Sequence, residues 1–274
     1  MIKEAKDIIN NADVVIITSG AGMGVDSGLP DFRGNEGMWR EYPVLKNLKL
    51  DFSSIANPKQ FEKNPKIAWG FYGHRYDLYK TTKPNVGFDF LKALVKNKKD
   101  YFIVTSNVDG HFQKAGFDQD KIYEVHGRIN KLQCTKCSTK PWDIDDDKRF
   151  DVDPKTFELG TTLPYCKKCN AIARPNIMMF DDYSYDNSIS EAQESRFNSF
   201  MRKYNDTNIV VIEIGAGIAI PTIRHIGEQI HKKIFTATLI RINPREAMVP
   251  HNGIGLATTG IESLKELCKD YMDE

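Results

Sequence analysis

Four short runs of apolar and β-branched residues recur along the chain, and each is followed by a polar, glycine or proline turn. Runs of this kind, with no polar alternation, are typical of strands buried on both faces of a parallel sheet. They cover Val14–Thr18, Tyr101–Thr105, Ile209–Ile214 and Ala237–Ile242. Helical patterns separate them, over Ile2–Asn11, Gly87–Asn97, Ser188–Tyr204, Pro221–Lys232 and Gly260–Tyr271. This alternation predicts an α/β fold with a Rossmann-like, doubly wound parallel sheet.

Three of the four predicted strands lead directly into small or polar residues. Ligands of doubly wound folds bind beyond the carboxyl ends of the strands, so we expect the chemistry at these turns. The turns are Gly20-Ala21-Gly22, Ser106-Asn107-Val108-Asp109 and Gly215-Ala216-Gly217.

Two segments do not fit the strand–helix alternation. Residues 39–85 are aromatic-rich and predict a helical insertion. Residues 131–171 hold two cysteine pairs and an acidic stretch, Asp143–Asp153, that is expected to be solvated. We therefore expect one large domain made of residues 1–38, 86–130 and 172–274, with the two insertions forming a smaller lobe.

The charge balance argues against a strong long-range field. Lys and Arg number 38 against 37 Asp and Glu, for a net charge of +1. Nucleic acid and membranes are therefore not expected as partners, and a local cleft should select what binds. The N-terminus lacks the apolar core of a signal peptide, and no apolar stretch of about 18 residues occurs. We expect a cytoplasmic protein with reduced cysteines.

Four of the five cysteines form two C-x-x-C pairs, Cys134/Cys137 and Cys166/Cys169. Two intervening residues let both sulfurs of a pair reach one tetrahedral ion at about 2.3 Å, and the second pair completes the coordination. The pattern predicts one structural zinc with no open position for catalysis. A redox pair or incidental cysteines are the alternatives. Cys268 stands alone and is expected to be a core residue.

The turn after the first predicted strand has two interpretations. Small residues in Gly20-Ala21-Gly22 would let backbone N–H groups approach a phosphate. The dinucleotide fingerprint G-x-G-x-x-G is not met, however, because Val25 occupies its last position, and a plain tight turn is the other interpretation. Asp31-Phe32-Arg33 follow. An arginine can fork onto a phosphate and a phenylalanine can exclude water, although an ordinary surface loop would have the same composition.

Amide, carboxylate and imidazole side chains provide the remaining candidates. Asn107 and Asp109 have groups that can fix ribose hydroxyls or a carboxamide. His126 carries an imidazole, whose ordinary pKa near 6.5 suits a general base at neutral pH. A structural role for His126 is the alternative, and His111 is the other histidine close to a strand end.

In this order, the motifs resemble those of the sirtuin family, whose members are NAD-dependent protein lysine deacylases. The first glycine turn with Ser27–Gly34 is similar to the family's cofactor-binding loop, and Thr105–Asp109 is similar to its Thr-Gln-Asn-Ile-Asp motif. Glu124–Gly127 is similar to its catalytic histidine segment, and the cysteine pairs to its zinc ribbon. Three further segments resemble its acyl-lysine strand and adenosine contacts: Arg174–Phe180, Gly215–Gly217 and Ile242-Asn243.

The resemblance implies an activity and residue roles. The acyl oxygen of a modified protein lysine would attack the ribose of NAD as nicotinamide leaves, and His126 would act as base on a ribose hydroxyl. Asn107 and Asp109 would be further catalytic residues. The products would be free lysine, nicotinamide and O-acyl-ADP-ribose. NAD would lie across the carboxyl edge of the sheet against Gly20, Ala21, Gly22, Asp31, Phe32, Arg33, Ser106, Asn107, Val108, Asp109, Gly215, Ala216, Gly217 and Asn243. The substrate would contact Ile177, Met178 and Phe180.

Tyr72 and Arg75 lie in the aromatic insertion with a Tyr-x-x-Arg spacing. This spacing is similar to that by which class III sirtuins bind acidic acyl groups such as succinyl. An arginine beside a phenol in an apolar tunnel would pair with a distal carboxylate. The alternative is a surface helix that carries both residues.

Several positions depart from the family pattern. They are Ser106 for the motif's glutamine, Gly24 and Gly217 for serines, Phe112 for a histidine, and Asp181-Asp182 for Gly-Glu. The two aspartates would add negative charge where a peptide docks. A deacetylase or desuccinylase is the main expectation, and the departures leave open an ADP-ribosyltransferase, an NAD hydrolase or a non-catalytic NAD-binding module.

Overall fold

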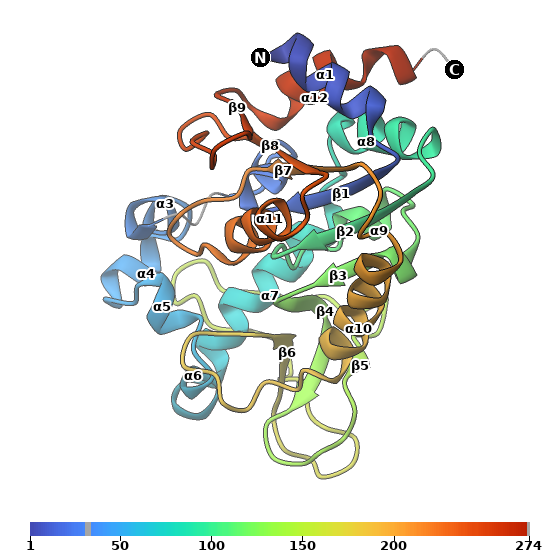
Figure 1. The fold of residues 1–274 in the computed structure, drawn as a ribbon. Coiled ribbons are helices and arrows are strands. Elements are labelled where there is room, and N and C mark those ends of the chain that lie inside the picture. Colours follow the sequence, from blue (N-terminus) through green and yellow to red (C-terminus); the bar gives the residue numbers. More distant parts are fainter. Residues whose placement is uncertain (31–33, 273–274) are drawn as a thin grey trace.

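The computed structural model describes residues 1–30 and 34–272 of the chain. Its larger sheet has six parallel strands in the order β3-β2-β1-β7-β8-β9 (Figure 1). The four strands predicted from apolar runs are confirmed, and the apolar pattern does not predict β3 and β9, which are three-residue edge strands. The strands are β1 (Val14–Ser19), β2 (Asp100–Thr105), β3 (Ile122–Glu124), β7 (Ile209–Ile214), β8 (Ala237–Ile242) and β9 (Ile254–Leu256).

Helices cover both faces of this sheet, as the doubly wound prediction requires. Successive residues of a strand point to opposite faces of the sheet, so alternate side chains of β1 pack into two different cores. Val15 and Ile17 pack with α1 (Ile2–Asn11), α8 (Val86–Lys96) and α12 (Gly260–Cys268). Val14 and Ile16 pack with α10 (Ser188–Lys203) and α11 (Thr222–Lys233). The predicted α/β fold class is therefore confirmed.

The last residues of the six strands lie in one row. Ser19 of β1 is in register with Thr105 of β2 and with Ile214 of β7. The row continues outward through Glu124, Ile242 and Leu256. From β1 the chain runs outward through β2 and β3 and returns at β7 on the other side of β1, which makes the β1/β7 boundary a topological switch point.

A second, three-stranded antiparallel sheet has the order β5-β4-β6. Its strands are β4 (Gly127–Cys134), β5 (Trp142–Asp143) and β6 (Ala173–Ile177). The aromatic insertion is helical, as predicted, and consists of α3 (Gly34–Glu41), α4 (Pro43–Asn47), α5 (Phe52–Ile55), α6 (Lys59–Lys63) and α7 (Pro65–Thr81). The short elements are α2 (Ala21–Val25), α9 (His111–Lys114), η1 (Gln119–Lys121) and η2 (Lys269–Tyr271).

A separate core joins the helical insertion to the smaller sheet. Trp69 of α7 stacks on Phe150 with ring centroids 5.0 Å apart, and its Nε1 donates to the Ala173 carbonyl of β6 at 2.9 Å. Phe150 and Ile144 are both buried in this core. The expectation that the whole acidic stretch is solvated is therefore wrong, because these two apolar side chains anchor it. In the described parts of the chain, no helix is long and apolar enough to cross a membrane.

Candidate functional site

The turns that follow β1 and β2 are joined by hydrogen bonds. The Ser106 N–H donates to the Ser19 carbonyl at 3.1 Å. Asn107 Nδ2 donates to the Gly20 carbonyl at 3.0 Å, while the Asn107 N–H donates to Thr105 Oγ1 at 3.1 Å. The Asn107 amide is thus held against the first glycine turn.

The turns that follow β1 and β7 touch through glycines. A methyl group on Gly215, whose φ is +62°, would lie 2.4 Å from Gly22 Cα. A methyl group on Gly20 would lie 2.7 Å from Ala216 Cα. Asn243, fully buried after β8, donates through Nδ2 to the Ala216 carbonyl at 2.9 Å. Glycine is therefore required by the close approach of the two turns, and three of the sheet's carboxyl-end turns meet here.

Asp109 lies beside Gly24 of α2, the short helix that begins in the first glycine turn. Its Oδ1 accepts the His111 N–H at 2.9 Å, and its Oδ2 would lie 3.3 Å from a methyl group on Gly24. His111 itself is fully buried, with its ring 5.8 Å from that of Phe88, and burial lowers its pKa. His111 is thus a core residue, whereas the Asp109 carboxylate lies beside the glycine turn.

His126 lies between β3 and β4 at the row of strand ends. The preceding Val125 N–H donates to the Thr105 carbonyl at 2.9 Å. The following Gly127 has a φ of +76°, and a methyl group there would lie 2.1 Å from the Asn176 oxygen. Burial lowers the pKa of His126 from 6.5, and a hydrogen bond with the Ser106 backbone partly opposes this shift. The imidazole is therefore neutral at pH 7, the form that accepts a proton.

The last residue of β6 and the three residues after it alternate between buried and exposed side chains. Ile177 and Met179 are buried, whereas Met178 and Phe180 are 46% and 37% exposed. The Met178 N–H donates to the His126 carbonyl at 3.0 Å, and the Phe180 N–H donates to the Ala56 carbonyl at 2.9 Å. This segment therefore connects the His126 turn to the helical insertion, with two apolar side chains facing outward.

Tyr72 and Arg75 are both buried on α7, which rules out a surface helix as their setting. Arg75 Nε and Nη2 donate to the Tyr79 hydroxyl at 3.0 and 2.7 Å. The guanidinium carbon lies 5.2 Å from the Phe71 ring centroid and 5.7 Å from that of Tyr72. Burial raises the pKa of the Tyr72 phenol to about 12. A permanent positive charge is thus held inside an aromatic shell.

Rings connect Arg75 to the segment after β6. The centroids of Phe180 and Phe52 are 5.6 Å apart, and those of Phe52 and Phe71 are 6.4 Å apart. Phe71 in turn contacts Arg75. A cavity of about 530 Å³ lies beyond Tyr79, and its walls include Tyr79 and Asp109. The residues of the two glycine turns, Gly20–Gly22 and Gly215–Gly217, do not line this cavity.

The expectation that both Asp181 and Asp182 add charge to a docking surface is wrong for Asp182. Its carboxylate is fully buried and pairs with the buried Arg174 at 2.8 Å. It also accepts the Met179 and Ser184 N–H groups at 3.2 and 3.1 Å. Asp181 is exposed and has a φ of +52°. Of the two aspartates, therefore, only Asp181 adds its charge to the surface.

The four paired cysteines converge. Their sulfurs all lie within 4.8 Å of one another, with Cys134 and Cys169 Sγ at 3.5 Å and Cys137 and Cys166 Sγ at 3.7 Å. Tetrahedral coordination with zinc–sulfur bonds of about 2.3 Å requires sulfurs about 3.8 Å apart, so the cluster fits one structural zinc. Cys268 is fully buried in the core, as expected.

The structure brings the described catalytic and cofactor-binding candidates to one edge of the larger sheet. Tyr72 and Arg75 lie on α7, and the four paired cysteines form a separate cluster. Asp31, Phe32 and Arg33 lie outside the described residues. Sequence reasoning missed Arg224 and Glu246, which organise the turns after β7 and β8. The one available signal was a cation in the first turn of a predicted helix, where the helix dipole disfavours it.

Comparisons with known proteins agree with this architecture. The model of the Sir2 family matches residues 20–222. An NAD-dependent protein deacylase of Leptospira interrogans serovar Lai is 31% identical over 260 residues, which cover 93% of this chain and 92% of that protein. One from Aquifex aeolicus is 30% identical over 68% of this chain and 69% of its own.

Solved structures show the same fold. The crystal structure of a Sir2 homolog in complex with NAD superposes with a TM-score of 0.74 at 22% identity, covering 99% of this chain and 94% of that one. A Sir2 variant with a deacetylated p53 peptide and 3'-O-acetyl ADP-ribose gives 0.68 at 20% identity, with 98% of each chain covered. The chain is therefore a member of the Sir2, or sirtuin, family.

Proposed function

We propose that this chain is an NAD-dependent protein lysine deacylase. The observation that carries the proposal is the common row in which the strands end, because it gathers the glycine turns, Asn107, Asp109 and His126 at one edge of the sheet. The relatives named NAD-dependent protein deacylase support the same activity.

NAD would bind across this edge. The touching turns at Gly20–Gly22 and Gly215–Gly217 carry small or no side chains, so a pyrophosphate could approach their backbones without obstruction. Asn107 and Asp109, both beside the first turn, provide the amide and carboxylate groups for the ribose and the carboxamide. Ala21, Ser106, Val108 and Asn243 complete this proposed surface, and Asp31, Phe32 and Arg33 belong to it on sequence grounds.

Bound NAD supplies the ribose carbon that takes the acyl oxygen as the bond to nicotinamide breaks. The chain's own contribution is to orient the ribose and to remove a proton. His126, neutral at pH 7, accepts the proton of a ribose hydroxyl, whose oxygen becomes bonded to the acyl carbon. One water is consumed, the lysine amine is released and the acyl group remains on ADP-ribose. Positioning and electrostatics in a desolvated site supply most of the rate.

The acyl-lysine would lie along Ile177–Phe180, next to His126. The line of rings from Phe180 through Phe52 and Phe71 leads from this segment to Arg75. An acetyl group needs only the apolar part of that path. A succinyl group would extend its carboxylate toward the Arg75 guanidinium, with the Tyr72 phenol nearby. We therefore propose activity on both acyl groups, with Arg75 selecting the acidic one.

The remaining assignments concern the smaller lobe and the compartment. We propose that residues 39–85 and 131–171 form this lobe around one structural zinc, while residues 1–38, 86–130 and 172–274 form the NAD-binding domain. The zinc cluster contributes rigidity and no chemistry, since four thiolates leave no open position. Four metal-binding thiolates suit a reducing compartment such as the cytoplasm.

Product analysis by mass spectrometry tests the activity. The purified chain is incubated with NAD and either an acetyl-lysine or a succinyl-lysine peptide. We expect O-acyl-ADP-ribose only when acyl peptide is present, and far slower formation of it with His126→Ala. ADP-ribose formed without peptide would replace the proposal with an NAD hydrolase. A mass gain of ADP-ribose on a protein would replace it with a transferase, and binding of NAD without any turnover would indicate a non-catalytic module.

A further inference from the structure

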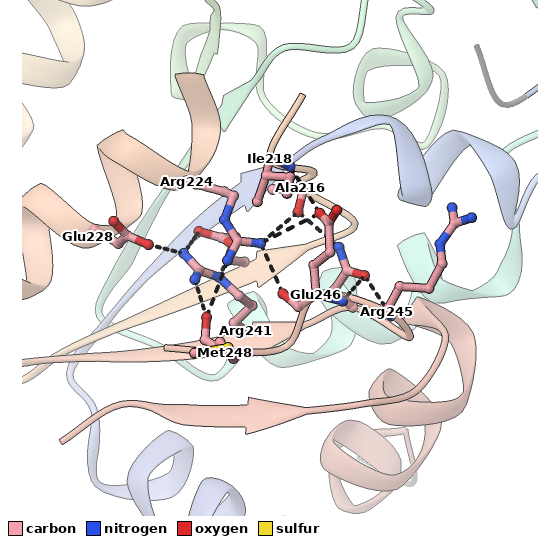
Figure 2. A network of polar contacts seen from close by, with 10 residues as sticks. Ala216, Ile218, Arg224, Glu228, Arg241, Arg245, Glu246 and Met248 are labelled. Carbon is pink, nitrogen blue, oxygen red and sulfur yellow. Dashed lines mark hydrogen bonds and ion pairs between the residues drawn. The ribbon is translucent and has the colours of Figure 1, made fainter. Parts of the chain in front are cut away.

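Arg224 lies at the centre of a polar network beside the turns that follow β7 and β8 (Figure 2). It is 8% exposed and stands in the first turn of α11. Its guanidinium donates to three backbone carbonyls: Ala216 at 3.3 Å, Glu246 at 2.9 Å and Met248 at 3.2 Å. One side chain therefore ties the turn after β7 to the turn after β8.

The main partners of the buried Arg224 guanidinium are backbone carbonyls of the two turns. A cation in the first turn of a helix is opposed by the helix dipole, and burial adds a desolvation cost. Its approach to the Glu246 carboxylate is long, at 3.9 Å, so the three carbonyls provide the main compensation. Arg241 on β8 differs, because its main partners are the carboxylates of Glu213 and Glu228. Its Nη1 also donates to the Met248 carbonyl, which the two arginines therefore share.

The contacts fix the direction of one peptide unit. The Ala216 carbonyl accepts from Arg224 Nη1 and from Asn243 Nδ2. In a trans peptide the carbonyl and the next N–H point in opposite directions, so the Gly217 N–H is directed away from the Arg224 guanidinium. Arg224 also holds the backbone of Glu246, whose Oε2 accepts the Ile218 N–H at 2.9 Å.

We infer that Arg224 is a positioning residue for the adenosine half of NAD. The inference rests on the proposed function, in which the turns after β7 and β8 receive that half. The guanidinium is buried and does not touch NAD. It pre-orders the two turns in the free protein, so that NAD does not have to supply the free energy of ordering them on binding.

Two variants test this inference. Arg224→Met removes all three hydrogen bonds, and Arg224→Lys keeps the charge but replaces the fork with a single ammonium, in a chain expected to fold. Calorimetry with AMP reports on the adenosine half alone, and ADP-ribose adds the second phosphate and the ribose that carries nicotinamide in NAD. We expect affinity to fall roughly tenfold in Arg224→Met and about threefold in Arg224→Lys. The KM for NAD should rise in parallel, while kcat and the KM for acyl peptide stay within about twofold.

Arg196→Met is the matched control, because Arg196 is a partly exposed arginine on α10. This variant should leave the affinities for AMP and ADP-ribose, both KM values and kcat unchanged. Equal affinity of wild type and both Arg224 variants for AMP and ADP-ribose would overturn the inference alone, as would an equal loss of kcat and of peptide binding. Absence of ADP-ribose binding by the wild-type protein would overturn the proposed function and this inference with it.

Discussion

The Met178 N–H donates to the carbonyl oxygen of His126 at 3.0 Å, so the main chains of these two residues are joined directly. Gly127 makes this possible, because any side chain there would collide with the Asn176 carbonyl. The proposed base and the proposed acyl-lysine segment therefore share one rigid support. Their separation is set by backbone hydrogen bonding, which point substitutions of either side chain leave intact.

The pH dependence of deacylation should report the buried imidazole. Because burial lowers the pKa of His126 below 6.5, the neutral base is already present at pH 7. We expect kcat/KM to be flat around neutrality and to fall only as the pH drops below about 6.5. His126→Ala should reduce the rate about 10²- to 10⁴-fold while ADP-ribose still binds. A fall in kcat/KM that begins above pH 7 would contradict the assignment.

The same shift has a consequence for stability. The unfolded imidazole has the higher pKa, so the unfolded state takes up the proton first as the pH falls. The contribution of neutral His126 is therefore present above pH 6.5 and lost below it. Denaturant unfolding of wild type and His126→Ala across this range should converge toward low pH.

Arg75→Met should separate the two acyl substrates. Removing a charge-assisted contact is expected to lower kcat/KM for a succinyl peptide about 10- to 100-fold. Deacetylation should change less than about twofold, since an acetyl group carries no charge for the arginine to pair with. Tyr79→Phe is the matched variant, because it removes the hydroxyl that orients Arg75 and keeps the ring. It should give a smaller loss in the same direction, whereas equal losses on both substrates would refute the role.

Zinc content and stability should depend on the four-cysteine cluster. Metal analysis should find one zinc per chain in the wild-type protein and less in Cys134→Ser, with a lower midpoint of thermal unfolding. Cys268→Ser provides the control, because that cysteine is buried far from the cluster in the main core. It should lose stability but keep its zinc. Folded wild-type protein free of any metal would contradict a structural zinc.

Substitution of Asp182 should lower the free energy of unfolding, whereas substitution of the neighbouring Asp181 should not. Asp182→Asn leaves the buried Arg174 guanidinium without its charge partner and should cost about 3 kcal/mol of unfolding free energy. Asp181→Gly relieves a φ of +52° and should leave stability equal or up to about 1 kcal/mol higher. Urea unfolding measures both. Acyl peptide should bind Asp181→Gly at least as well as wild type if the exposed carboxylate opposes docking.

Alanine substitutions at Gly28 and Gly215 separate two costs, that of a left-handed backbone conformation and that of a steric collision. Gly28→Ala meets nothing within 4 Å and should cost only the left-handed backbone, about 1–2 kcal/mol. Gly215→Ala adds a collision with Gly22 and should cost about 2–5 kcal/mol, with loss of NAD binding. Comparable costs for the two variants would show that the turns after β1 and β7 separate more easily than their packing indicates.

The sequence by itself determined the elements that depend on short-range pattern. Uninterrupted apolar runs indicated the four central strands because a strand buried on both faces cannot alternate. Two C-x-x-C pairs predicted the zinc cluster because that spacing suits tetrahedral coordination. β3 and β9 were not predictable in this way, since three residues carry too little periodicity.

Tertiary structure decided what the polar residues do. Asp181 and Asp182 are the same residue type at neighbouring positions, yet Asp181 is exposed and Asp182 is buried against Arg174. Only the packing of the folded chain determines which of the two carboxylates is removed from water. In the sequence, Arg224 is one more residue of a predicted helix. In the structure, the turns after β7 and β8 bring three carbonyls within hydrogen-bond distance of its guanidinium. Burial and long-range hydrogen bonds join residues far apart along the chain, and no local pattern encodes them.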